Sequence, residues 1–299
     1  MISAATPEDQ RALAQLTTPC GQDGSGRLRY SAAMHFNRKG MLSDAALEAY
    51  RMCSPYDAED PAGLLRSNGL EREIPKVSDL PGDMAIRLLV EEVERYFAGM
   101  NTPGIAEVRA GLSRWQSAPV TPARSPANAV IEKWLPFALD QLGKTHPALA
   151  RAISLANPHL HWLTFDGYPV EEVGAEFATG HAYASIFGEE AGANIPAVDW
   201  DMGLFLIPPD VLYRDHKHQA PELYAPLTGP HGWRFGADRP LTILPAHKPV
   251  WNDAFVPHLT KVGPVPFLCL YCWTKDVHAG AEIVPASDWD ALENLRLKA

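Results

Sequence analysis

The first half of the chain carries apolar residues at the spacing of amphipathic helices, in segments separated by polar loops that contain Pro or Gly. In residues 84–100 the apolar positions recur at intervals of three and four and fall on one helical face: Ile86, Leu89, Val90, Val93 and Phe97. The same spacing predicts helices over residues 105–115 and 129–142. The pattern therefore predicts a mainly helical N-terminal region over residues 1–158.

Start signals predict two more helices in this region. Thr6 precedes Pro7, which is the usual order of an N-cap residue and a first helical residue. Ser43 precedes an Ala-rich segment in the same way. The loop 116–127 contains three prolines and is expected to be an ordered connector.

From about His159 the pattern changes to short runs of aromatic and β-branched residues, broken by Gly and Pro. Such runs are typical of an antiparallel barrel or sandwich. Their Pro and β-branched content argues against helices over residues 200–275. The expected fold is therefore α+β, with a double-stranded β-barrel domain over residues 159–299. The predicted strands cover residues 162–165, 183–187, 202–207, 211–215, 222–227, 232–235, 241–244, 250–251, 255–258 and 265–273.

Composition and charge exclude several kinds of partner. The 299 residues are 46% hydrophobic and 21% charged, as in ordinary globular proteins. The net charge of −10 and the lack of a basic run argue against nucleic acid or an anionic membrane as partner. No segment approaches 18 uninterrupted apolar residues, and the N-terminus does not resemble a signal peptide. A cytoplasmic location is expected.

Two of the four cysteines, Cys269 and Cys272, form a C-x-x-C motif that alone would suggest redox or zinc chemistry. They lie within the apolar run 265–273, which reads as a buried strand. Because residues three apart face opposite sides of a strand, the two thiols are not expected to meet. We interpret them as core thiols in a reducing compartment.

The segment 210–229 carries the candidate chemistry. His216 and His218 are two apart, so in an extended strand their side chains point to the same face. Residues 219–221 then predict a turn, with the next strand returning antiparallel from Glu222 and aiming its carboxylate at the two imidazoles. Two imidazoles and a carboxylate suit Zn²⁺, Fe²⁺, Mn²⁺ or Ni²⁺ and leave positions open for a substrate.

The spacing H-x-H-x3-E-x6-G, which ends at Gly229, resembles the first motif of the cupin superfamily, with Asp210 where that motif usually begins with Gly. Cupins draw a further His ligand from a later strand, and His258 is the candidate here. His231, in the turn after Gly229, and His247, in a Pro-flanked loop, could replace His258, but neither falls at the end of a strand that enters the late barrel. His161 and His181 precede the core motif and are less favoured.

The family can be narrowed from a longer run. The sequence GLFLIPPDVLYRDHKHQAPELYAPLTG, followed by GW, PVW, PH and FLCLYCW, resembles the dimethylsulfoniopropionate lyase-like cupins over roughly residues 160–275. The resemblance extends to ASIFGEEAG at residues 184–192 and to a long helical N-terminal region. It implies that a divalent metal is bound and that Tyr224 acts as a base, with the metal ligands His216, His218, Glu222 and His258.

The implied reaction is a β-elimination that releases dimethyl sulfide and acrylate from a small carboxylate substrate. A cation that binds the carboxylate acidifies the neighbouring C–H and favours the phenolate of a tyrosine whose ordinary pKa is about 10. Aromatic faces can hold a sulfonium by cation–π attraction. The substrate-binding candidates are Tyr213, Trp233, Trp251 and Tyr271, with core packing as the alternative for Tyr271 and for Trp273.

Other functions fit the same residues. Three His and one Glu also suit an Fe²⁺-dependent oxygenase, and a related lyase, isomerase or hydratase could act on another carboxylate. A non-catalytic binding or sensor cupin is a third reading, in which Tyr224 only hydrogen-bonds a ligand or water. The helical region could cover the pocket or form the interface of a homodimer.

Overall fold

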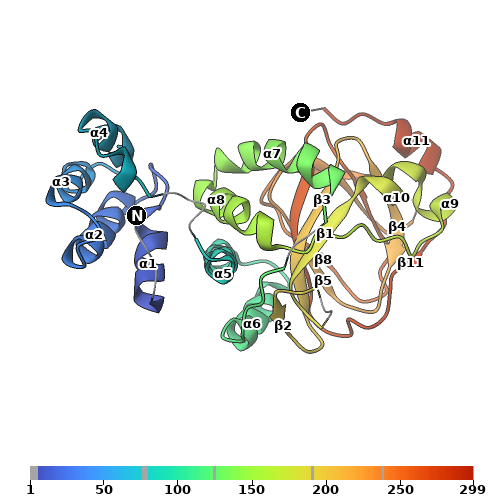
Figure 1. The fold of residues 1–299 in the computed structure, drawn as a ribbon. Coiled ribbons are helices and arrows are strands. Elements are labelled where there is room, and N and C mark those ends of the chain that lie inside the picture. The colour runs from blue at the N-terminus through green and yellow to red at the C-terminus, as the bar shows by residue number, and fades with distance from the viewer. Residues whose placement is uncertain (1–5, 76–79, 124–125, 190–191, 238, 299) are drawn as a thin grey trace.

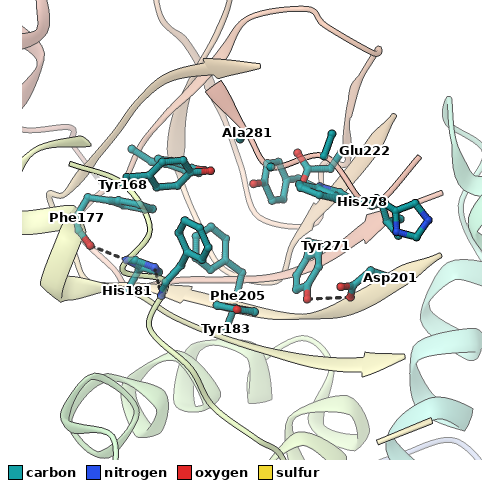
Figure 2. A pocket seen from close by; sticks show the side chains of 17 residues that line it. Tyr168, Phe177, His181, Tyr183, Asp201, Phe205, Glu222, Tyr271, His278 and Ala281 are labelled. Atoms are coloured by element: carbon teal, nitrogen blue, oxygen red, sulfur yellow. Dashed lines mark hydrogen bonds between the residues drawn. The ribbon is translucent and has the colours of Figure 1, made fainter. Parts of the chain in front are cut away.

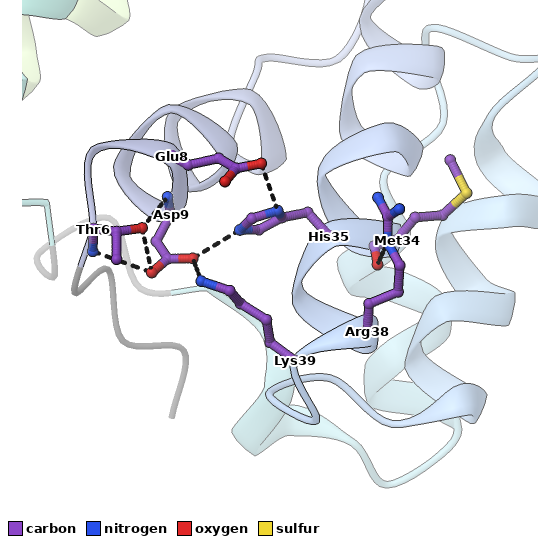
Figure 3. A network of polar contacts seen from close by, with 7 residues as sticks. All are labelled: Thr6, Glu8, Asp9, Met34, His35, Arg38 and Lys39. Carbon is purple, nitrogen blue, oxygen red and sulfur yellow. Dashed lines mark hydrogen bonds and ion pairs between the residues drawn. The ribbon is translucent and has the colours of Figure 1, made fainter.

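The computed structural model describes residues 6–75, 80–123, 126–189, 192–237 and 239–298 (Figure 1). The first helices form a bundle around an apolar core of their own. Thr6 caps the first helix, as predicted, and Asp9 in that helix contacts His35 and Lys39 at the end of the second (Figure 3). These helices are α1 (Pro7–Leu16), α2 (Ser25–Arg38), α3 (Asp44–Cys53) and α4 (Pro61–Ser67), followed by the 3-10 turn η1 (Glu71–Glu73).

A second group of helices lies against the strands. It comprises α5 (Gly82–Ala98), α6 (Ile105–Trp115), α7 (Ala129–Gly143) and α8 (Pro147–Ala156), with the 3-10 turn η3 (Asn157–His159). Three of these helices start and end within two residues of the predicted segments. Two short helices that the sequence did not predict, α9 (Val170–Val173) and α10 (Ala175–Gly180), precede the first strand.

The strands all lie in the second half of the described chain and form two sheets. The first has the order β2 (Ile195–Pro196), β1 (Ala182–Gly188), β3 (Asp201–Ile207), β10 (Phe267–Trp273), β5 (Glu222–Pro226) and β8 (Val250–Asn252). The second has the order β11 (Glu282–Ile283), β4 (Leu212–Lys217), β9 (His258–Lys261), β6 (His231–Phe235) and β7 (Thr242–Leu244). A last helix, α11 (Trp289–Asn294), packs near β4.

Alternation along the strands of the first sheet creates two apolar cores. Leu204 and Leu206 on β3 face outwards and join one core with helices α5 to α8. Phe205 and Ile207, on the other face of the same strand, join the barrel interior. The apolar core therefore runs from the helices into the sheet, across the predicted boundary between residues 158 and 159.

Two predicted strands differ in the structure. Residues 162–165 contribute only an isolated bridge between Leu163 and Tyr183. The backbone N–H of Phe165 donates to the His181 ring instead of to a strand. The strand predicted over residues 255–258 begins only at His258. Phe255 has a φ of 59°, which no strand residue adopts, because the chain makes a turn there.

The pairing predicted around residues 219–221 also differs. A strand does begin at Glu222, but β5 pairs with β10 and β8, whereas β4 pairs with β9 and β11 in the other sheet. Both edges of each strand are occupied by these partners, so β4 and β5 cannot form a hairpin with each other. The connection instead carries the chain from one sheet to the other.

The cysteines follow the prediction. Cys269 and Cys272 are free thiols that are fully buried, and they lie in different apolar cores on opposite faces of β10. Among the described helices, none is long and apolar enough to cross a bilayer.

Candidate metal centre

Three histidines meet inside the barrel. His216, near the end of β4, is the direct register partner of His258, the first residue of β9, and their ring centroids are 4.2 Å apart. His218 follows β4 in the connection, with its ring centroid 4.9 Å from that of His258. Each residue is at most 4% exposed. One ring nitrogen from each lies within 4.8 Å of the other two, which is the spacing of ligands around one ion.

Hydrogen bonds fix the tautomer of all three rings. Nδ1 lies 2.8, 2.7 and 3.0 Å from a backbone carbonyl oxygen two positions away in the chain, for His216, His218 and His258 respectively. A carbonyl only accepts, so Nδ1 carries the proton and Nε2 keeps its lone pair. Among the described residues, the buried Nε2 atoms of His216 and His258 have no hydrogen-bond partner. Lone pairs without a donor are what a metal ion requires.

Glu222 completes the donor set from the opposite sheet. Its Oε2 lies 3.2 Å from Nε2 of His218 and 3.5 Å from Nε2 of His258. Asn252 donates to Oε2 at 3.1 Å, and Trp273 donates to Oε1 at 2.8 Å. A carboxylate oxygen and an imidazole lone pair repel at these distances unless a proton or a metal ion lies between them. The residues present therefore fit a divalent ion held by three nitrogens and one oxygen.

Electrostatics favour the ligating forms of His216 and Glu222. Burial, and then the neighbouring rings of His258 and His218, lower the pKa of His216 well below its usual range, so this ring is neutral. Burial alone would raise the pKa of Glu222, but His218 and His258 hold it below its usual range. Burial alone would lower the pKa of His218, but the charge of Glu222 and its hydrogen bond raise it, so an ion bound there would displace a proton from this ring. Neutral imidazoles and an ionised carboxylate are the forms that bind metal.

A cavity of about 290 Å³ opens beside Glu222 (Figure 2). One wall is aromatic, and the tyrosines Tyr213, Tyr224 and Tyr271 contribute their rings to the lining. The segment 277–281 lines it as well. Every described residue that lines the cavity lies at or after Phe165, so helices α1 to α8 contribute no side chain to it. The cavity is large enough for a small molecule. His216, His218 and His258 are not among its described lining residues, and they neighbour it through Glu222 and through Tyr213 and Trp273, whose rings pack on His216 and His218.

Comparison with known proteins identifies the group to which this site belongs. A family model described as dimethylsulfoniopropionate lyase matches residues 106–269, more than half of the chain. The chain belongs to the dimethylsulfoniopropionate lyase family. The family is one of carbon–sulfur lyases, which confirms the predicted class of enzyme, and the match begins in α6, upstream of the segment that carried the resemblance.

Solved structures agree with the fold of this lyase family member. A structure described as that of the dimethylsulfoniopropionate lyases RdDddP and RnDddQII is 20% identical, with a TM-score of 0.55, and covers 69% of this chain and 100% of its own. The dimethylsulfoniopropionate lyase DddQ from Ruegeria pomeroyi DSS-3 is 25% identical, with a TM-score of 0.54, and covers 68% of this chain and 97% of its own. The predicted cupin barrel with a helical N-terminal region is confirmed. No curated protein matches the chain.

The structure places the predicted aromatic residues of this family member in two groups. Tyr213 and Tyr271 line the cavity. Trp251 is the register partner of Leu223, which faces away from the barrel interior, and its ring lies against Gly104 in the helical layer. Trp233 packs on Tyr224 and, among the described residues, is not part of the cavity lining. Alternation decides the side for Trp251, since its neighbour Val250 on β8 faces the barrel interior.

The competing histidines of the lyase family member have other partners. His181 donates from Nδ1 to the Phe177 carbonyl at 2.6 Å and accepts the Phe165 N–H at Nε2. His231 accepts the Gly263 N–H at 3.1 Å. His247 lies in a loop, and its ring forms hydrogen bonds with residues of the helical layer. The ring nitrogens of these three histidines form hydrogen bonds within the fold, and they are not part of the cluster of His216, His218 and His258.

Sequence reasoning missed part of the cavity. Phe177 lies on α10, between two of the predicted strands, and no motif marks it. Asp201 begins β3 and alternates with Phe205 on the cavity side, so a strand register would have placed it there. That register depends on the pairing of β3 with β10, which cannot be read from the sequence pattern.

Proposed function

We propose that the protein is a metal-dependent lyase that cleaves dimethylsulfoniopropionate, or a closely related small carboxylate, into acrylate and dimethyl sulfide. The observation that carries the proposal is the convergence of three imidazole lone pairs and Glu222 beside a cavity that Tyr224 also lines. His216, His218, Glu222 and His258 would hold one divalent ion, with Zn²⁺, Fe²⁺, Mn²⁺ and Ni²⁺ as the candidates. When bound, the ion supplies Lewis acidity toward a substrate carboxylate and positive charge that favours a nearby phenolate.

Tyr224 is proposed as the base because of its position. It lies two residues after Glu222 on β5, so both side chains point to the same side of the strand, into the barrel. Burial, and then the negative charge of Glu222, raise the pKa of Tyr224 well above its ordinary value when no cation is present. The free protein therefore holds Tyr224 as a phenol, and its conversion to a base is linked to occupancy of the histidine cluster.

The proposed step balances in atoms and electrons. The phenolate oxygen of Tyr224 takes the proton from the carbon next to the carboxylate. The electron pair of that C–H bond forms the new C=C bond, while the C–S bond breaks and its pair leaves with sulfur as neutral dimethyl sulfide. Aromatic rings around the cavity, among them Tyr213, exclude water and offer faces to the sulfonium.

The test is the release of dimethyl sulfide, measured by headspace gas chromatography with purified protein, dimethylsulfoniopropionate and a panel of added divalent metals. We expect the release to depend on added metal. The His218→Ala variant should lose both the bound metal and the release of dimethyl sulfide. His161→Ala is the matched control, because His161 lies outside the cluster and the cavity lining. Metal-loaded protein that releases no dimethyl sulfide would contradict the proposal, and oxygen consumption with bound iron would indicate an oxygenase instead.

A further inference from the structure

Four aromatic rings form a continuous stack that ends at one of the clustered histidines. Phe177 on α10 lies parallel to the rings of His181 and Tyr213, with centroids 4.3 and 4.0 Å away and interplanar angles of 8° and 6° (Figure 2). Tyr213 in turn stacks on His216, with centroids 3.8 Å apart at an angle of 19°. All four residues are at most 7% exposed. A side chain of α10 is therefore connected to the proposed metal centre through a single intervening ring.

An irregularity in β4 makes the contact between Tyr213 and His216 possible. Residues three apart in a regular strand point to opposite faces of a sheet. In the pairing of β4 with β9, Tyr213 stands opposite Thr260, whereas His216 stands opposite a residue two positions earlier, His258. The strand β4 thus advances by three residues where β9 advances by two, which is a bulge with one extra residue. The bulge returns both rings to the barrel interior, as bulges often do beside a functional site.

The bulge residue Arg214 connects the same parts of the chain a second time. Its carbonyl oxygen accepts the hydrogen bond from Nδ1 of His216 at 2.8 Å. Its guanidinium donates through Nη1 to the backbone carbonyls of Glu171 and Glu172 on α9, at 2.8 and 3.1 Å. Since α10 follows α9 directly (Figure 1), this pair of short helices is held to β4 by Arg214 as well as by Phe177.

The stack restricts the orientation of the His216 ring. The hydrogen bond at Nδ1 fixes that nitrogen but leaves the ring able to tilt about it, and the face of Tyr213 limits the tilt. Phe177 and His216 both lie parallel to Tyr213 at about one ring thickness, so they must occupy its opposite faces. Phe177 therefore supports the ring that supports His216. A ligand that is oriented before the ion arrives loses less freedom on binding.

We infer that Phe177 is a positioning residue for the proposed metal ligand His216 and acts through the ring of Tyr213. The inference rests on the proposed function, since it assumes that a divalent ion occupies the histidine cluster. Loss of the Phe177 ring should weaken metal binding and alter the geometry of the ligands. A residue that only filled space would affect the stability of the fold and leave both properties unchanged.

The test measures metal binding by the unmodified protein and by two variants at position 177. Phe177→Leu keeps an apolar side chain but removes the ring, and Phe177→Tyr keeps the ring. Competition with a chelating dye would give Kd for Co²⁺, and the visible absorption of the Co²⁺ complex would report the geometry of its ligands. We expect Phe177→Leu to raise Kd by about three- to tenfold, the usual contribution of a stacked pair, and to change the absorption bands. Phe177→Tyr should restore both.

Controls separate this effect from misfolding and from failure of the proposed reaction. Phe36→Leu removes a fully buried ring from the N-terminal bundle and should leave Kd and the absorption bands unchanged. Circular dichroism would verify the fold of each variant, and Phe177→Met would replace a Phe177→Leu protein that does not fold.

A folded variant without the ring that binds Co²⁺ as tightly as the unmodified protein, with the same absorption bands, would overturn the inference. An unmodified protein that binds no Co²⁺ would overturn it together with the metal centre. Because no substrate is present in these measurements, the expected changes in a protein that releases no dimethyl sulfide would support the inference and contradict only the proposed reaction.

Discussion

Glu222 has both oxygens engaged by side chains from neighbouring strands, and this fixes the direction of its remaining lone pairs. Asn252 comes from β8 and Trp273 from β10, the two strands that flank β5. Outer hydrogen bonds of this kind orient a metal ligand before the ion arrives. The imidazoles are fixed in the same way by backbone carbonyls, so the whole donor set is ordered without an ion.

The proposed base role of Tyr224 leads to the first prediction. Tyr224→Phe removes one oxygen and leaves the ring to pack against Trp233, so the protein should fold and bind metal as before. Loss of a general base typically lowers the rate by about 100- to 10,000-fold, and we expect kcat for dimethyl sulfide release to fall within that range. Elemental analysis would check the metal content.

The matched control is Tyr50→Phe, a buried tyrosine in the N-terminal bundle, which should leave kcat unchanged. Release by Tyr224→Phe at a rate similar to that of the unmodified enzyme would remove Tyr224 from the mechanism. Loss of metal together with activity would assign it a structural role at the site.

At this scale the sequence predicts what is local, and it reaches the distant His258 only through the resemblance to cupins. His216, His218, Glu222 and Tyr224 lie within nine residues, so their spacing alone places them together. Asp201 is beyond that reach, because only strand pairing brings it opposite Trp273. Trp251 was predicted to bind substrate but faces the helical layer, because a shift of one residue along a strand moves a side chain to the opposite face of the sheet.

The last helix is attached to the barrel by buried charges. Arg234 on β6 forms ion pairs with Asp215 on β4 and with Asp288 just before α11, and Trp289 donates to Asp215 at 2.8 Å. The side chains of Arg234 and Asp215 are fully buried. One carboxylate therefore joins two strands and a helix, directly beside the proposed ligand His216.

Asp215→Asn should destabilise the protein strongly, because it leaves a buried guanidinium without its full countercharge. Breaking a buried pair by removing one partner costs about 3–5 kcal/mol, and we expect the free energy of unfolding to fall by that order. Urea unfolding of the metal-free protein would measure it, so that metal binding does not contribute. Asp140→Asn, whose pair with Lys144 is exposed, should change it by less than about 0.5 kcal/mol.

The contact of α1 with α2 should depend on pH. Hydrogen bonds from Lys39, and then from His35, lower the pKa of the buried Asp9 well below its usual range. The stabilisation is full where the carboxyl is also ionised in the unfolded chain, above about pH 4, and is lost as the pH falls below that value. Asp9→Asn should therefore lower the protection of α1 and α2 amides against hydrogen exchange at pH 7, and by less at pH 3.

A difference between the two proteins that stayed constant from pH 7 to pH 3 would contradict this account of Asp9. The exposed variant Asp140→Asn should show no such difference at either pH.

Elements were easier to predict than their pairing. Periodicity located α5, α6 and α7 closely, because a helix is closed by local hydrogen bonds. Strand positions also followed from composition. The predicted pairing of β5 with β4 was wrong, because β5 pairs with β10 and β8. Which strand lies beside another depends on contacts distant in sequence, and β10, which pairs with both β3 and β5, lies more than 40 residues beyond either.

For the whole molecule, the apolar core determines which part of the chain can fold alone. Residues 159–299 contain the strands, but the outer face of the first sheet is covered by helices α5 to α8. A fragment of residues 159–299 would expose that face to water and should aggregate. A fragment of residues 80–299 keeps the cover and should be monodisperse and folded, by size-exclusion chromatography and circular dichroism. A soluble, folded fragment 159–299 would show that the barrel does not need the helices.

The ligands of the proposed metal site come from both sheets. His216 and His258 belong to the second sheet and Glu222 to the first, with His218 in the connection between them. A bound ion would therefore cross-link the two halves of the barrel as well as serve chemistry, and would stabilise the folded chain by mass action. Unfolded protein is degraded in cells, so the supply of metal would set how much of this protein accumulates, in addition to how much of it is active.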